Sequence, residues 1–169
     1  MSYFDELIPI IEQLKAESDR ALVLITAALV ENELVKHLEL RLLEKIERND
    51  ELLHRADFEL KVILAYRSGV ITKNEHDVYQ QLRKLRNKCA HDATDQSFDK
   101  DHFKARMKNI IEKSPEVWNA LKKDFDSIDA YLEHTGWRES FILFFGMIIM
   151  HKRKSYNKVI KVKSLSGRT

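Results

Sequence analysis

The stretch of sequence most informative about the fold is residues 18–48, SDRALVLITAALVENELVKHLELRLLEKIER, which contains neither Gly nor Pro. Within it, a series of positions at three- and four-residue steps is apolar except for one carboxylate: Leu24, Ala28, Glu31, Val35, Leu38 and Leu42. This spacing matches one face of an α-helix, where residues three and four apart are neighbours. We therefore predict one amphipathic helix of about thirty residues that spans the domain.

The whole chain is poor in residues that form turns. Its 169 residues include 4 Gly and 2 Pro, well below the roughly 12% that these two types make up on average. A β-sandwich or a barrel needs a turn about every ten residues, so those classes are excluded. The length suits one domain, and we predict an all-α fold with a single domain over residues 1–150.

Further helices are predicted on both sides of residues 18–48. Gly69 has the position of a residue that ends a helix, and Thr72 with Glu75 has the spacing of a capping box that begins the next one. Ser114 and Pro115 mark the start of another helix. The other expected ranges are Tyr3–Leu14, Phe58–Ser68, Thr72–His91, Phe103–Lys113 and Glu139–Met150.

The sequence shows no sign of export or of a membrane span. The N-terminal residues, MSYFDELIPIIEQ, lack the basic region of a signal peptide, and the single Cys89 cannot form a disulfide within the chain. The longest apolar run near the C-terminus is Phe141–Met150, whereas a membrane-spanning helix needs about twenty residues. We expect a cytoplasmic protein that does not contact a membrane.

Charge is distributed unevenly along the chain. The net charge is +2, yet no acid follows Glu139, and residues 151–169 carry seven positive charges. Removing these seven leaves residues 1–150 at −5, so an acidic body is followed by a basic C-terminal tail. Such a tail can contact phosphates, or it can be a solvated end that aids solubility, and the sequence leaves both interpretations open.

The helix predicted over Thr72–His91 carries the most informative polar residues. At 100° per residue its core face consists of Val78, Leu82, Leu85 and Cys89, and a polar face consists of Arg86, Asn87, Ala90 and His91. An arginine can hold phosphate oxygens in a fork and an imidazole titrates near neutral pH, so this face suits a phosphodiester. Alternatively, Arg86 and His91 are ordinary surface residues that the helix dipole favours near a C-terminus.

Other charged residues are candidates for supporting this site. Arg83, Lys84 and Lys88 on the same helix can bind phosphates. Glu31 lies on the apolar stripe of the long helix, where a carboxylate needs a partner. It either orients the arginine or the histidine of the motif, or makes an ordinary contact at a dimer seam or with a lysine.

No cofactor or metal site is expected from the sequence. Its histidines do not have the HxxxH or HExxH spacing of metal ligands, and a second Cys is missing. No Walker A motif, dinucleotide fingerprint or nucleophile elbow occurs. Lys61, on an otherwise apolar helix face, is interpreted as a surface lysine whose stem covers apolar neighbours.

Three blocks of the sequence resemble one protein superfamily. Residues 85–91, LRNKCAH, resemble the Arg-polar-x-x-x-His motif of the HEPN superfamily. Residues 57–71, DFELKVILAYRSGVI, are similar to a block of the mannitol operon repressor (MltR) family, a branch of that superfamily. Residues 18–21 (SDRA) and 27–31 (AALVE) are similar to the first long helix of this family, so the resemblance covers about residues 18–95.

The resemblance implies an antiparallel helical bundle, to which the unmatched residues 96–169 add extra C-terminal helices. It also implies a homodimer, with the motif of each protomer facing a cleft between the two. Many HEPN proteins act on RNA as metal-independent endoribonucleases in toxin–antitoxin, defence or RNA-processing systems. An antitoxin or a regulatory protein is then a further partner.

The chemistry implied by the resemblance is attack of a ribose 2′-OH on its own phosphate. His91 would act as general acid or base, Arg86 would stabilise charge on the phosphate, and Asn87 would orient the imidazole or donate to the phosphate. The mannitol-repressor branch is associated with transcriptional regulation. A non-catalytic regulator or protein-interaction module is therefore the alternative.

Overall fold

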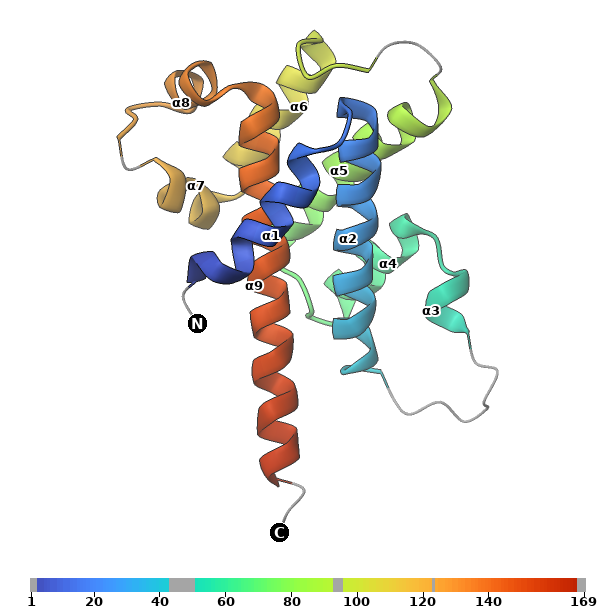
Figure 1. Ribbon diagram of the computed structural model, residues 1–169. Coiled ribbons are helices and arrows are strands. Elements are labelled where there is room, and N and C mark those ends of the chain that lie inside the picture. The colour runs from blue at the N-terminus through green and yellow to red at the C-terminus, as the bar shows by residue number, and fades with distance from the viewer. Residues whose placement is uncertain (1–2, 43–50, 93–95, 123, 167–169) are drawn as a thin grey trace.

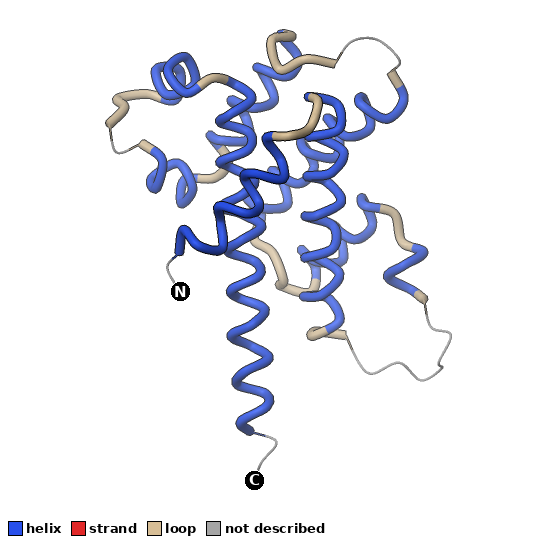
Figure 2. Tube along the Cα trace, in the orientation of Figure 1, coloured by secondary structure: helices blue, strands red, loops and turns tan. Residues whose placement is uncertain are grey.

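The computed structural model describes residues 3–42, 51–92, 96–122 and 124–166, and within these ranges it contains helices and no strand (Figures 1 and 2). The prediction of an all-α fold is therefore confirmed. In the described ranges, none of the helices is both long and apolar enough to cross a membrane. The helices are α1 (Tyr3–Lys15), α2 (Asp19–Glu39), α3 (Leu52–Arg55), α4 (Phe58–Arg67), α5 (Lys73–His91), α6 (Asp101–Glu112), α7 (Pro115–Leu121), α8 (Ile128–Thr135) and α9 (Trp137–Ser166).

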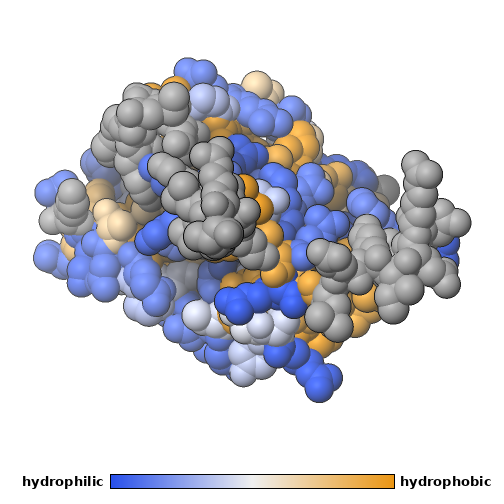
Figure 3. Space-filling model, turned by 90° about the horizontal axis from the view of Figure 1, so that it is seen from below, coloured by the Kyte–Doolittle hydropathy of each residue, from blue (hydrophilic) through white to orange (hydrophobic). Residues whose placement is uncertain are grey.

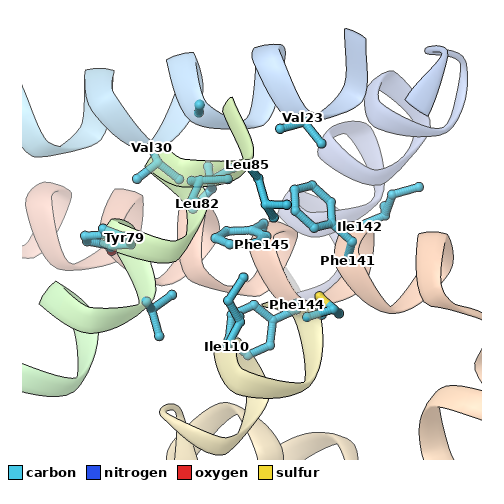
Figure 4. Packing of buried hydrophobic residues seen from close by; sticks show 14 of the residues in the cluster. Val23, Val30, Tyr79, Leu82, Leu85, Ile110, Phe141, Ile142, Phe144 and Phe145 are labelled. Atoms are coloured by element: carbon cyan, nitrogen blue, oxygen red, sulfur yellow. The ribbon is translucent and has the colours of Figure 1, made fainter. Parts of the chain in front are cut away.

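The centre of the molecule is built from α1, α2, α5 and α9. α2 packs against α5 and α9, α1 lies against α9, and α4 packs against both α2 and α5 (Figure 1). Between them, Phe141 and Phe145 of α9 meet Leu82 and Leu85 of α5 in a buried cluster (Figure 4). Because α6 also contacts α5, this helix is fixed from several sides and only its outer face remains toward solvent.

The first long helix differs from the prediction in length and in phase. α2 ends at Glu39 rather than near Arg48, and residues 43–50 lie outside the described ranges. Of the predicted stripe, only Leu38 is fully buried, and Ala28 is exposed. Residues 21–30 are almost entirely apolar, so their spacing cannot identify the buried face. The buried residues of α2 are Leu22, Val23, Thr26, Ala27, Val30, Glu33, Leu34 and Leu38.

The turn between α4 and α5 follows the predicted signals. Gly69 has a φ of 72°, and its N–H donates to the Tyr66 carbonyl at 3.1 Å, while the Val70 N–H donates to the Ala65 carbonyl at 2.8 Å. These two bonds form a Schellman motif, which requires a left-handed residue after the helix. The capping box then begins α5, because the Thr72 hydroxyl accepts from the Glu75 N–H at 3.2 Å and the Glu75 carboxylate accepts from the Thr72 N–H at 2.8 Å.

The region between α6 and α9 contains one expected helix start and one helix that was not predicted. α7 begins at Pro115, as expected, although the Ser114 side chain makes no capping bond. α8 was missed; its N-terminus is capped by the Ser127 hydroxyl, which accepts from the Ala130 N–H at 3.1 Å. α8 ends at Thr135, and Gly136, which follows it, has a φ of 88°.

The last helix is much longer than predicted and continues through the domain boundary drawn at residue 150. α9 has 30 residues, whereas the sequence predicted a helix over Glu139–Met150 and a tail beyond it. Lys152 is only 8% exposed, and its Nζ lies 2.6 Å from Glu75 Oε1. Arg153 Nε donates to Glu33 Oε1 at 3.1 Å. The first two charges of the supposed tail are therefore ion-paired to α5 and α2, and Lys152 is also buried.

Candidate functional site

The motif that the sequence singled out lies at the C-terminal end of α5. The predicted core residues Val78, Leu82, Leu85 and Cys89 are all buried. On the opposite side, Arg86 and Asn87 are half-buried and His91 is exposed. The helical geometry thus turns the motif away from the core, as the spacing predicted.

Arg86 and Asn87 are joined by a direct contact within the motif. Arg86 Nη1 donates to Asn87 Oδ1 at 3.1 Å. Among the described residues, no carboxylate pairs with Arg86, and the side chain of His91 makes no hydrogen bond or ion pair. The amide of Asn87 therefore orients the guanidinium rather than the imidazole. Most of the Arg86 donors stay available to an anion.

Arg20, at the start of α2, was not predicted as a site residue. Its Nη2 donates to the carbonyl of Ala90 at 3.5 Å, so α2 brings a second guanidinium to the C-terminal end of α5. Cations are stabilised there because carbonyls of the last helical turn lack helical partners. The only signal in the sequence was the position of Arg20 in the SDRA block of the family resemblance.

Glu31 does not join this site. Its carboxylate is bound by the Nζ of Lys61, a residue of α4 that is 6% exposed. The structure therefore agrees with the alternative in which Glu31 is the ordinary partner of a lysine. The interpretation of Lys61 as a surface lysine was wrong, because α4 turns this side chain toward α2.

The three cations proposed to bind phosphate differ in their partners. Arg83 Nη1 lies 2.7 Å from Glu59 Oε2, and its Nε donates to Gln80. Lys88 lies 3.5 Å from Asp92. Lys84 is exposed, and within the described ranges it forms no ion pair. The surface around the motif is thus less basic than the count of lysines and arginines predicts.

Two titratable residues next to the motif have shifted pKa values. Burial lowers the pKa of the His102 imidazole on α6, and the neighbouring charges of Lys88 and Arg106 lower it further. Burial raises the pKa of the Cys89 thiol to about 11, which removes it as a nucleophile. His91 is therefore the more suitable group for proton transfer, because it is the exposed one.

A cleft of about 370 Å³ lies at the other end of α5, between α5, α7 and α9. One wall is apolar and includes Met147 and Ile148, and the other includes the Glu75–Lys152 ion pair. Burial raises the pKa of Glu75, but the nearby Lys152 ammonium and the bonds from Thr72 outweigh this, so the pKa is lowered overall. No residue of the Arg86–His91 motif lines the cleft.

A metal centre has no ligand set in the part of the chain that is described, where no group of three or more His, Cys, Asp or Glu side chains is placed to hold an ion. Searches of protein-family models, of curated proteins and of solved structures find no match to this chain.

Proposed function

We propose that this chain is an RNA-acting protein of the HEPN type, in the branch of the mannitol operon repressors, and that it is a metal-independent endoribonuclease. The observation that carries this proposal is the exposure and the hydrogen bonding of Arg86 and His91. Both lie on the side of α5 that is turned away from the core; among the described residues, the Arg86 side chain hydrogen-bonds to Asn87 of the same motif, and His91 is exposed. A half-buried guanidinium without a carboxylate partner keeps donors for a phosphate, and an exposed imidazole can exchange a proton with a ligand.

The spacing on α5 supports a site made by two protomers. Arg86 and His91 are five residues apart, which separates them by about 140° around the helix and about 7.5 Å along it. The two side chains therefore leave α5 in different directions, and one helix alone supplies a single arginine and a single histidine. In a homodimer, two copies of the outer face of α5 would supply two arginines and two histidines to one cleft.

The proposed reaction needs only these side chains. One His91 accepts the proton of a ribose 2′-OH as its oxygen attacks the adjacent phosphorus, and the P–O5′ bond breaks to leave a 2′,3′-cyclic phosphate. The second His91 donates a proton to the departing O5′. Arg86, held by Asn87, stabilises the negative charge that develops on the phosphate oxygens.

The experiment that tests the activity is RNA cleavage in EDTA by the purified protein and by Arg86→Ala and His91→Ala. We expect cleavage by the parent protein only, with products that end in a 2′,3′-cyclic phosphate. His54→Ala is the matched control, because it removes an exposed histidine on α3. Equal cleavage by all four proteins would identify a contaminating nuclease and contradict the proposal.

A second candidate is a non-catalytic regulator or protein-interaction module that uses the same surface. The pairing of Arg83 with Glu59 and of Lys88 with Asp92 favours it, because both pairs reduce the positive charge that RNA would meet. A protein without cleavage activity, in which Arg86→Ala weakens binding to an antitoxin or other regulatory protein, would support this candidate.

A further inference from the structure

The second half of α9 extends beyond the other helices of the molecule (Figure 1). Its last fixed points on the body are the ion pairs of Lys152 and Arg153 and the ring of His37, which bonds the Lys152 carbonyl at 2.9 Å and lies edge-on to Tyr156. Beyond them the described side chains at 157–160 are exposed. We call residues 157–166, which follow these contacts, the basic arm.

All charged residues of the basic arm are positive. It contains Lys158, Lys161 and Lys163, and no acid occurs anywhere after Glu139. Closer to the body, Lys152 and Arg153 are paired with Glu75 and Glu33. The body therefore keeps the charges at the base of the helix and leaves a positive element projecting from it.

The lysines of the basic arm follow one another along the helix. Lys158 and Lys161 are three residues apart, which places them on one face of the helix about 4.5 Å apart along the axis, and Lys163 follows two residues later. Lysines spaced this closely on one helix can contact phosphates of a strand without reading its bases.

We propose that the basic arm binds the phosphate backbone of RNA and supplies the affinity that the surface around Arg86 and His91 lacks. The proposal deepens the proposed function, on which its choice of RNA rests. Binding by the arm would depend on charge and not on sequence. It would also bring the strand to the body, where the outer face of α5 is available.

A membrane surface fits the basic arm less well. A helix that lies on a membrane needs one continuous apolar face. Val159 and Ile160, 39% and 40% exposed, are adjacent in sequence and point about 100° apart, and Tyr156 already contacts His37. Seen from below, polar and apolar areas alternate on the face from which α9 extends (Figure 3).

The acidic body of a second copy is also a weaker partner for the arm. The carboxylates of Asp19, Glu33, Glu59 and Glu75 are already bound to arginines or lysines of their own chain. The arm of a second copy would have to displace these basic partners to reach the four carboxylates.

The test measures binding of a labelled single-stranded RNA by fluorescence anisotropy over a series of salt concentrations, in EDTA and on a His91→Ala background that prevents cleavage. The arm variant is Lys158→Gln/Lys161→Gln/Lys163→Gln. The control, Lys15→Gln/Lys113→Gln/Lys122→Gln, removes the same charge from exposed lysines of α1 and of the two helix ends around α7. Circular dichroism checks that all proteins keep their helix content.

We expect the arm variant to bind RNA about tenfold more weakly and to lose about 2 from the slope of log K against log salt, since each lost contact to a single strand removes about 0.7. The control should stay within about twofold of the parent. DNA of the same sequence should give the same slope as RNA, because the arm contacts phosphates only.

Three outcomes would overturn the assignment of the basic arm. The parent could show no salt-dependent binding of RNA, or the arm variant and the control could lose the same RNA affinity. The third outcome is a salt dependence of binding that is seen with RNA but not with DNA. Binding to vesicles of phosphatidylserine and phosphatidylcholine without binding to RNA would assign the arm to a membrane instead. If the protein binds RNA through the arm but cleaves no RNA, the proposed nuclease activity is contradicted and the assignment of the arm to RNA is supported.

Discussion

Glu31 and Glu33 are two residues apart on α2, and folding gives them different partners. Glu31 binds Lys61 of α4, whereas Glu33, only 3% exposed, binds Arg153 of α9. Glu31 was selected from the sequence because it interrupts an apolar stripe, whereas Glu33 was not selected. Glu33 also lies 3.0 Å from Lys36 of its own helix, but Lys61 and Arg153 are distant along the chain, so spacing within α2 cannot identify these two partners.

We expect Glu31→Gln to lower the free energy of unfolding by about 2 kcal/mol, because it leaves the buried Lys61 ammonium without a carboxylate. Urea denaturation measures the change. Glu39→Gln, at an exposed position of the same helix, should cost less than about 0.5 kcal/mol. Equal losses of stability in the two variants would contradict this role. A loss of RNA cleavage in Glu31→Gln, in a protein that is fully folded, would show that Glu31 does more than stabilise the fold.

Arg138 joins the start of α9 to the turn between α1 and α2. Its Nε donates to Asp19 Oδ1 at 2.9 Å, and its Nη2 donates to the carbonyls of Lys15 and Glu17 at 3.3 and 2.5 Å. We expect Arg138→Lys to lower stability by about 2 kcal/mol, since a single ammonium cannot reproduce this fork. Thermal unfolding tests it against Arg67→Lys, an exposed arginine whose replacement should leave the melting temperature within about 2 °C.

At the scale of helices, the predictions from the sequence were most accurate where they rest on local signals. The Thr72 capping box, Gly69 and the core spacing from Val78 to Cys89 placed α5 and its outer face, and with them the motif. The phase of α2 was wrong because an almost uniformly apolar segment has no preferred face. The length of α9 was wrong because Lys152 and Arg153 look like a solvated tail until their partners on α5 and α2 are known.

Gly69 tests how far the turn before α5 depends on one backbone conformation. Its φ is +72°, and a Cβ there would meet no atom within 4 Å, so a substitution is penalised by backbone strain alone. We expect Gly69→Ala to cost about 1 kcal/mol and Gly69→Asn to cost less, because Asn tolerates the left-handed region. A loss above 3 kcal/mol, or the same loss for both residues in urea denaturation, would show that space rather than conformation is limiting.

For the whole molecule, the Glu75–Lys152 pair links stability to pH. The folded protein lowers the pKa of Glu75 below its ordinary value of 4.5, so the charged carboxylate stabilises the fold above that pH. This contribution is lost as the pH falls through the lowered value. Sequence reasoning could not foresee it, because Thr72 and Glu75 were interpreted only as a helix cap.

We expect Glu75→Gln to be less stable than the parent at pH 7 and to lose less of its stability when the pH is lowered to about 3, since Gln keeps the capping bond without the charge. Urea denaturation at several pH values measures both effects. Glu112→Gln, which removes an exposed carboxylate at the end of α6, should follow the parent curve. Parallel curves for Glu75→Gln and the parent would contradict the linkage.

The anchoring of α9 to the first turn of α5 also sets a distance. Glu75 holds Lys152 at one end of α5 and His91 lies at the other, and a helix of 19 residues is about 28 Å long. If an RNA strand is held on the basic arm and cut at His91, α5 fixes the distance that the strand must span between the anchor of α9 and His91. A strand too short to span this distance could then not use the basic arm and His91 at the same time, so the arm would aid the cleavage of longer RNAs only.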